Sequence, residues 1–97
     1  MLNKEEAREI ALVTIAESAR KTGYDLIIME KAIVEKEFAW VFPFNTREYI
    51  ETGNIKKMTV GNGPVVVNRR TGAVVVAPPM PIEHFLAQYE ADLNASN

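Results

Sequence analysis

The chain has 97 residues, of which 47% are hydrophobic and 25% are charged, and its formal net charge is −2. A chain of this length buries one hydrophobic core, so we expect a single domain over residues 1–97, with a frayed tail from about residue 94. The mixed, slightly acidic charge argues against a nucleic-acid-binding protein, which would carry a basic stripe. The sequence contains no cysteine, and this excludes disulfides, thiolate catalysis and cysteine zinc sites.

The N-terminal residues, Met1 to Glu6, lack the basic and apolar segments of a signal peptide. No apolar run in the sequence is long enough to span a bilayer. We therefore expect a cytoplasmic protein that has no membrane partner.

The first predicted element is a helix that begins after Asn3. Asn3 and Glu6 have the spacing of a capping box, and Gly23 provides the left-handed stop at the other end. The apolar residues between them form a broad band rather than a narrow stripe, which is typical of a helix that lies across a sheet.

Two extended segments are predicted to follow. The segment 25–37 is mostly apolar with a Glu-Lys pair in its middle, and the sequence leaves open whether it is one bent strand or two pieces joined by a short connection. The segment 38–44 alternates with a period of two, the clearest strand signal in the chain. The aromatic face predicted for it consists of Phe38, Trp40, Phe42 and Phe44. Pro43 has no amide to donate, so this end of the strand is expected at a sheet edge or a bulge.

A short helical turn is predicted for residues 45–53. Asn45 and Glu48 have capping-box spacing, and Gly53 is the expected terminator. Residues 55–60 are expected to form another strand, which leads into a glycine-rich turn.

That turn is Gly61-Asn-Gly-Pro64. Gly61 and Gly63 are expected to adopt positive φ, and Pro64 opens the next strand where no ladder donor is required. A phosphate-binding loop needs free amides that lead into a helix, whereas here Pro64 removes an amide and a strand follows. We therefore interpret this segment as a structural turn.

Two valine triplets, Val65–Val67 and Val74–Val76, predict a tight hairpin. Arg70-Thr71-Gly72 suits a three-residue loop between them, a type I turn closed by Gly72 in the left-handed region. A strand with one solvated face should alternate apolar and polar residues, and neither triplet does. Both faces of the hairpin therefore need cover. It could come from helices on opposite faces, from long side chains over the second face, or from a protein partner or second copy bound to the outer face.

The last predicted element is a helix for which Pro81 suits the first position. Its core-facing residues have helical spacing and are Ile82, Phe85, Leu86, Tyr89 and Leu93. The order of elements predicts an α+β fold, in which an antiparallel sheet of about four strands packs with an N-terminal and a C-terminal helix.

Candidate catalytic groups are sparse. His84, the single histidine, is expected on the polar side of the last helix, and no serine stands where it could pair with it. The carboxylate pairs, Glu35 with Glu37 and Glu48 with Glu51, are interpreted as solvated surface charge. We therefore expect a protein that is not an enzyme, with no catalytic, cofactor-binding or metal-binding residues.

A protein-binding surface is the alternative to a catalytic site. Arg69, Arg70 and Thr71 lie at the predicted hairpin tip, and Glu35 and Glu37 lie on the strand segment before the aromatic run. If the chain binds a protein partner, we expect these residues to contact it.

Several segments, in this order, resemble the immunity protein 35 family, which includes the YrhB-type small chaperone domains. They are Glu37 to Phe42, Tyr49 to Gly53, Gly61 to Val67, Thr71-Gly72 and Pro81 to Glu83. The resemblance covers roughly residues 25 to 90. Pro43 departs from the family pattern, which continues the strand with an aromatic residue.

The resemblance implies a small non-enzymatic α+β domain of bacterial origin. Family members are expected to neutralise a co-encoded toxin by binding it, and the chaperone branch to hold unfolded clients, so toxin binding and a holdase activity are the two alternatives. The resemblance supplies no catalytic residue. The positions that match its signature, interpreted as structural together with Gly72, are Trp40, Gly61, Gly63 and Pro64.

Overall fold

The computed structural model describes residues 1–60 and 63–95. Its helices are α1 (Lys4–Thr22), α2 (Arg47–Thr52) and α3 (Ile82–Ala95), with short 3-10 helices η1 (Glu30–Ala32) and η2 (Ile55–Lys57). Its strands are β1 (Leu26–Ile28), β2 (Val34–Glu35), β3 (Ala39–Phe42), β4 (Phe44–Thr46), β5 (Val65–Asn68) and β6 (Val74–Val76). The predicted α+β class, with a helix at each end of the chain, is confirmed.

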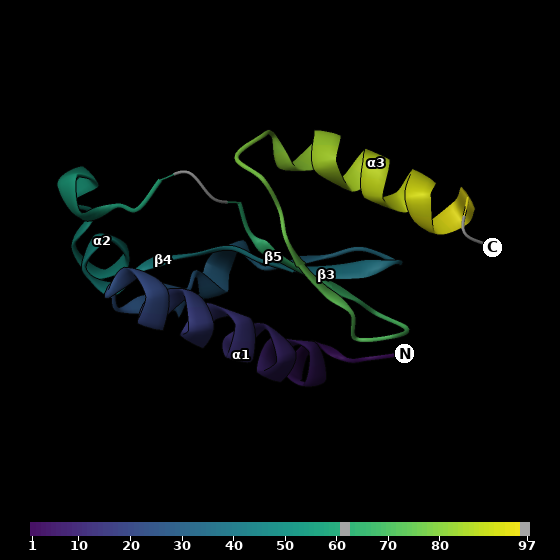
Figure 1. The fold of residues 1–97 in the computed structure, drawn as a ribbon, viewed down its shortest axis with the longest axis horizontal. Helices are drawn as coiled ribbons and strands as arrows, with labels where there is room; N and C mark the ends of the chain where they lie inside the picture. The colour runs from purple at the N-terminus through teal and green to yellow at the C-terminus, as the bar shows by residue number, and fades with distance from the viewer. Residues whose placement is uncertain (61–62, 96–97) are drawn as a thin grey trace.

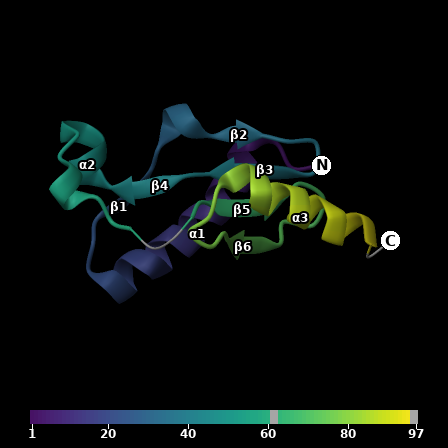
Figure 2. The ribbon, with the colours of Figure 1, turned by 90° about the horizontal axis from the view of Figure 1, so that it is seen from above.

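The strands of the described residues form a four-stranded antiparallel sheet in the order β2-β3-β5-β6, and a separate antiparallel pair of β1 and β4. The helices α1 and α3 lie on opposite faces of the larger sheet (Figure 1). Figure 2, seen from the α3 side, shows β6 at one outer edge of that sheet and β2 at the other. The larger sheet is therefore the middle layer of a helix–sheet–helix sandwich.

A core rich in aromatic residues fills the space between α1 and the sheet. Trp40, Phe42 and Phe44 point to this side, and all three are at most 7% exposed. Ala7 and Ala11 of α1 are fully buried, and their small side chains let the helix backbone approach the strands. At roughly 25 cal/mol per Å² of apolar surface, burial of these rings stabilises the fold by several kcal/mol.

A second core fills the space between the sheet and α3. Ala39, Val41 and Val66 point to this side, and they pack against Leu86 of α3. Three more of the predicted core positions of this helix are partly buried and contact the same cluster. They are Ile82, Phe85 and Tyr89. The helical spacing read from the sequence therefore identifies the face of α3 that meets the sheet.

The two cores explain why the valines of β5 do not alternate with polar residues. Val65 and Val67 belong to the α1 core and Val66 to the α3 core, and all three are fully buried. Helices on opposite faces cover β5, which is one of the explanations that the sequence left open. The valines of β6 are different, because each of them is 36–37% exposed.

The predicted aromatic face is wrong at Phe38. Trp40, Phe42 and Phe44 share one core, but Phe38 packs with the α3 core, with its ring centroid 5.9 Å from that of Tyr89. The reason is that β3 begins at Ala39, so Phe38 lies in the bend before the strand, where the period of two does not apply.

The segment 25–37 consists of two short strands joined by the 3-10 turn η1. They pair with different partners, since β1 joins β4 and β2 joins β3. Pro43 separates β3 from β4 at the point where the chain passes from one sheet to the other, which agrees with its expected place at a strand interruption.

Two further predictions between residues 45 and 60 are wrong. The cap of α2 is Thr46 rather than Asn45, because Asn45 lies in β4 and its side chain bonds the backbone of Thr59 instead. Residues 55–60 are not a strand, because Asn54 caps the 3-10 turn η2 there.

The glycines at chain reversals serve two different purposes. Gly23, Gly53 and Gly72 have φ between 75° and 79°, as predicted for the first two as helix ends and for Gly72 in the hairpin loop. Gly63 does not have the expected positive φ. It is needed for space, because a Cβ there would lie 2.7 Å from the carbonyl oxygen of Ala77. Gly61 lies outside the described residues.

Candidate functional site

The fold brings the residues predicted to contact a partner to one end of the molecule. The Arg69 guanidinium donates to the Glu35 carboxylate at 2.9 Å and to the Lys36 carbonyl at 2.9 Å. These bonds join the end of β5 to β2 and to the turn that follows it. Glu37, Arg70 and Thr71 lie next to this junction and line a common hollow.

Arg69 acts mainly as a structural residue. Its side chain is only 17% exposed, and its guanidinium carbon lies 4.8 Å from the centre of the Trp40 ring, a cation–π contact. Its Nε is buried without a hydrogen-bond partner. Glu35 and Arg69 are therefore engaged with each other and with the core, and they offer a partner less than the sequence suggests.

The hollow at this end, which we call the hairpin hollow, has a volume of about 340 Å³. It lies between the hairpin loop and the C-terminal half of α3, and its lining consists of Glu37, Phe38, Asn68, Arg70, Thr71, Glu90, Leu93 and Asn94. Two apolar side chains thus lie among charges of both signs. Within the described part of the chain, neither the Glu37 carboxylate nor the Arg70 guanidinium belongs to an ion pair, so both charges are available to a partner.

The loop that carries Arg70 is held in a fixed shape. The Asn68 side chain accepts hydrogen bonds from the amides of Arg70 and Thr71, at 2.8 and 3.1 Å. The amide of Gly72 donates to the carbonyl of Asn68 at 2.9 Å, and the Thr71 hydroxyl accepts from the amide of Ala73. Because the loop is already ordered, binding there costs little conformational entropy.

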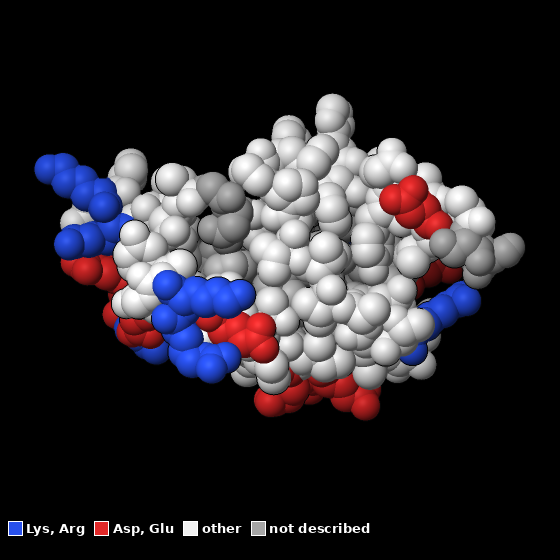
Figure 3. All heavy atoms as spheres, viewed as in Figure 1, with Lys and Arg blue, Asp and Glu red and all other residues white. Residues whose placement is uncertain are grey.

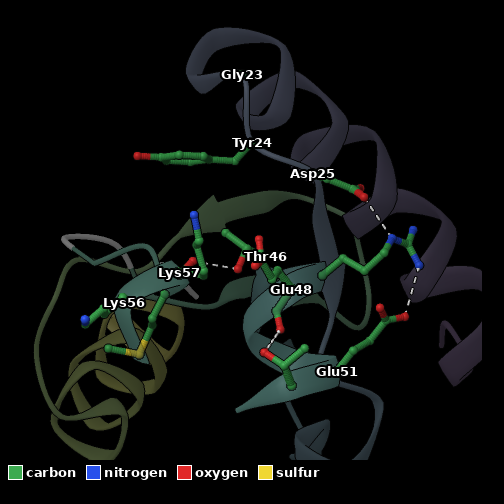
Figure 4. Close-up of a pocket in the computed structure, with 11 residues that line it drawn as sticks. Gly23, Tyr24, Asp25, Thr46, Glu48, Glu51, Lys56 and Lys57 are labelled. Atoms are coloured by element: carbon green, nitrogen blue, oxygen red, sulfur yellow. Dashed lines mark hydrogen bonds and ion pairs between the residues drawn. The ribbon is translucent and has the colours of Figure 1, made fainter. Parts of the chain in front are cut away.

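A second and larger cleft, which we call the α2 cleft, lies at the opposite end of the molecule and has a volume of about 560 Å³. In Figure 4, Lys56 and Lys57 project from one side of it and Glu48 and Glu51 from the other, with Tyr24 at the rim. This cleft was not predicted from the sequence, because it forms where the turn after α1 meets α2 and η2.

The charges in the α2 cleft partly neutralise each other. Arg47 donates to Asp25 at 2.8 Å and also lies 3.8 Å from Glu51. The hydrogen bond to Asp25, reinforced by its charge, raises the pKa of the Arg47 guanidinium above its ordinary value. The carboxylates of Asp25 and Glu51 thus hold Arg47 in place. Because they are engaged in this way, they are poorly suited to act as a general acid and base.

The remaining candidates for chemistry do not converge. Among the described residues, no group of three histidine, aspartate or glutamate side chains is arranged to hold a metal ion. His84 is exposed on α3 and lies outside both hollows. In the same ranges, no helix is long and apolar enough to cross a membrane.

The residues assigned to the family signature occupy structural positions wherever the structure describes them. Trp40 is buried and donates from its indole nitrogen to the carbonyl of Leu2 at 3.0 Å. Gly63 and Pro64 begin the hairpin, and their backbones bond to Ala77.

Comparison with known proteins decides the family. The sequence profile described as Immunity protein 35 matches residues 5–92. The chain belongs to this family. It is also 33% identical over 52 residues to an uncharacterized protein, YrhB, of Escherichia coli strain K12. That match covers 53% of this chain and 55% of YrhB, so the chain matches about half the length of this relative. No solved structure matches the chain.

The family match extends further than the resemblance expected from the sequence motifs. It includes nearly all of α1, which lies before the segment 25–90 covered by the resemblance, and most of α3. The match thus spans nearly the whole helix–sheet–helix sandwich of this chain.

Proposed function

We propose that this protein is a bacterial immunity protein that neutralises a cognate toxin by binding it directly. The observation that carries the proposal is the family match over residues 5–92. The activity is stoichiometric and non-enzymatic, because masking a toxin requires a complementary surface and no covalent step. The protein would meet its toxin in the cytoplasm of the producing cell.

The hairpin hollow is the surface that best fits this function. Its free charges, Glu37 and Arg70, have opposite signs and flank the apolar side chains of Phe38 and Leu93. Apolar contacts supply much of the affinity at a protein interface, while complementary charges at the rim select the partner and speed its association. The ordered hairpin loop adds the rigidity that tight binding favours.

Co-expression tests the proposal in cells. The effector encoded beside this gene is expressed in a bacterial host, with or without this protein, and growth is measured. We expect the protein to restore growth, and Arg70→Glu and Glu37→Arg to weaken binding of the effector by at least about tenfold each, because they reverse charges at the rim. Failure of the intact protein to restore growth would refute the proposed function.

Matched controls separate the surface from the fold. Lys31→Glu and Glu17→Arg make the same charge changes at exposed positions outside the hairpin hollow, and we expect both variants to protect cells like the parent protein. If all four variants protect equally, toxin neutralisation stands and the hairpin hollow is the wrong surface.

The alternative function, a holdase for unfolded clients, rests on the resemblance to the chaperone branch and on valines that do not alternate with polar residues. The second argument is weakened, because in β5 these valines are buried between two helices. Only the valines of β6 stay exposed, and they form a strand edge rather than an open apolar face.

A further inference from the structure

The outer edge of the larger sheet at β6 is an exposed, uncharged strand. In the described part of the chain no strand pairs with β6 on the side away from β5. The stretch Ala73 to Ala77 contains only alanine and valine. Natural proteins usually protect such an edge with lysine, proline or a bulge, because unpaired backbone groups invite another strand. The β6 edge has no such protection before Pro78.

The β6 edge lies on the face of the molecule that Figure 3 shows. Figure 2 places β6 on the side that faces the viewer in Figure 1, and Figure 3 has the same viewpoint. Charged side chains gather toward the periphery of that face, including acidic ones over the C-terminal half of α3, and its middle, over the hairpin, is uncharged. A strand that docks on β6 would therefore meet no charged side chains over the hairpin.

The ladder between β5 and β6 determines which backbone groups point outward. The amide of Asn68 donates to Ala73 at 2.8 Å, and the amide of Ala77 donates to Pro64 at 2.9 Å. In an antiparallel pair, inward and outward residues alternate. Since positions 73 and 77 point toward β5, so does Val75, and the N–H and C=O groups of Val74 and Val76 point outward.

We propose that a second copy of this chain covers the β6 edge, so that two β6 strands pair antiparallel about a two-fold axis through Val75. In this register Val74 of one copy opposes Val76 of the other, and each such pair exchanges both of its hydrogen bonds. All outward groups of β6 are then satisfied, and the two larger sheets become one continuous sheet. This inference goes beyond toxin binding and does not rest on it.

Side-chain positions agree with the same register. Val74 and Val76 oppose Val67 and Val65 of β5 and so lie on the α1 face, whereas Val75 opposes Val66 and lies on the α3 face. Across the axis Val75 would meet its own copy, and the other two valines would meet each other. In a two-fold interface a residue on the axis meets its own copy, so an uncharged strand pairs with itself without repulsion.

The features of the β6 edge favour a second copy over a strand of a foreign protein. Discrimination between partners relies on complementary charges, and β6 carries none, whereas the hairpin hollow carries charges of both signs. Stable interfaces bury about 1,200–2,000 Å² in total, more than three residues can supply. Pairing of β6 alone would bury less than this, so we expect a weak and reversible dimer.

Sedimentation equilibrium over a wide range of protein concentration tests the proposal. We expect a monomer–dimer equilibrium for the parent chain, and at least about tenfold weaker association for Val75→Lys, which places like charges opposite each other. Val13→Lys is the matched control, since Val13 is an exposed valine on α1, and we expect it to dimerise like the parent. A parent chain that stays monomeric at the highest concentrations would overturn the proposal.

A second variant keeps the dimer test decisive if Val75→Lys fails to fold. Val76→Pro removes an amide that points away from β5, so the intramolecular ladder is kept while the outer edge is blocked. We expect it to fold, as circular dichroism would show, to be monomeric and to neutralise the toxin as the parent does. If Val76→Pro dimerises like the parent, the β6 edge is not where the two copies meet. If the parent is monomeric and Val76→Pro loses toxin binding, the edge binds the toxin rather than a second copy.

Discussion

At the scale of single residues, Trp40 of the α1 core connects several parts of the molecule. It packs against α1, donates to the carbonyl of Leu2, and lies under the Arg69 guanidinium. These contacts join the N-terminus, the aromatic strand and the end of β5. Trp40 is thus buried and bonded within the fold, and we infer that it serves folding rather than binding.

Truncation of this side chain is therefore expected to destabilise the whole fold. Trp40→Ala should lower the free energy of unfolding by about 3–5 kcal/mol, the usual loss when a large aromatic is removed from a core. Trp40→Phe should lose less, because it keeps a ring against α1 but not the hydrogen bond to Leu2. Urea denaturation measures both changes, and a loss below about 1 kcal/mol for Trp40→Ala would contradict the placement of this ring in the core.

Gly63 is a second residue whose identity is determined by space. Gly63→Ala should lower the free energy of unfolding by about 1–3 kcal/mol, because the new Cβ would meet the carbonyl oxygens of Ala77 and Pro78 at 2.7 and 2.8 Å. Gly53 is the contrasting case, since a Cβ there would meet no atom within 4 Å but φ is 75°.

Asparagine distinguishes the two causes, because it tolerates positive φ better than alanine does. By thermal denaturation, Gly53→Asn should be more stable than Gly53→Ala, whereas Gly63→Asn should be no more stable than Gly63→Ala. Recovery of stability by asparagine at position 63 would show that backbone conformation, and not crowding, requires the glycine there.

At the scale of elements, the docking of α3 on the sheet depends on a small aromatic cluster. The ring centroid of Tyr89 lies 5.9 Å from those of Phe38 and Phe85. Burial raises the pKa of the Tyr89 hydroxyl above its ordinary value of 10.0, and a hydrogen bond with Asn68 acts in the opposite direction. The neutral side chain is therefore the form that the folded protein favours.

This shift gives the stability a dependence on alkaline pH. A pKa that is raised by folding contributes stability that is fully present below the unfolded value and is lost as pH rises through the folded value. We expect the parent to lose stability above about pH 10, and to lose more of it than Tyr89→Phe, which cannot ionise there. Urea denaturation at neutral and alkaline pH measures this, and parallel pH profiles for the two proteins would contradict it.

Elements that are set by local sequence were predictable, and those set by distant contacts were not. The capping box of Asn3 and Glu6 and the left-handed Gly72 form as the sequence indicates, because their partners lie within a few residues. The hairpin loop is one residue longer than predicted, because Asn68 bonds Ala73 and Arg69 therefore belongs to the loop. The cap of α2 was misplaced because Asn45 bonds Thr59, which is distant in sequence. Phe38 was assigned to the wrong core because the start of β3 determines its direction.

The same distinction holds for the candidate site. Glu37, Arg70 and Thr71 were proposed from the sequence because the strand and the hairpin tip place them locally. Glu90 and Leu93 complete the hairpin hollow, but they reach it only because the connector after β6 returns α3 across the sheet. No spacing within the sequence could show that approach.

At the scale of the whole molecule, one sheet between two helices leaves distinct surfaces for distinct purposes. The sheet faces are covered by α1 and α3, the hairpin hollow carries free charges at one end, and β6 leaves an uncharged edge along one side. On this account the end of the molecule binds the toxin and the edge joins two copies. The two surfaces can be altered separately, which makes both proposals open to test.

The central claim is that this protein acts by occupying a surface of its toxin. The measurement that tests it most directly is the residual activity of a fixed amount of purified toxin as this protein is added in increasing amounts. We expect activity to fall linearly and to reach its minimum when the two proteins are equimolar. Complete inactivation at far less than equimolar amounts would reveal catalytic turnover and contradict the claim, as would full toxin activity in the presence of excess protein.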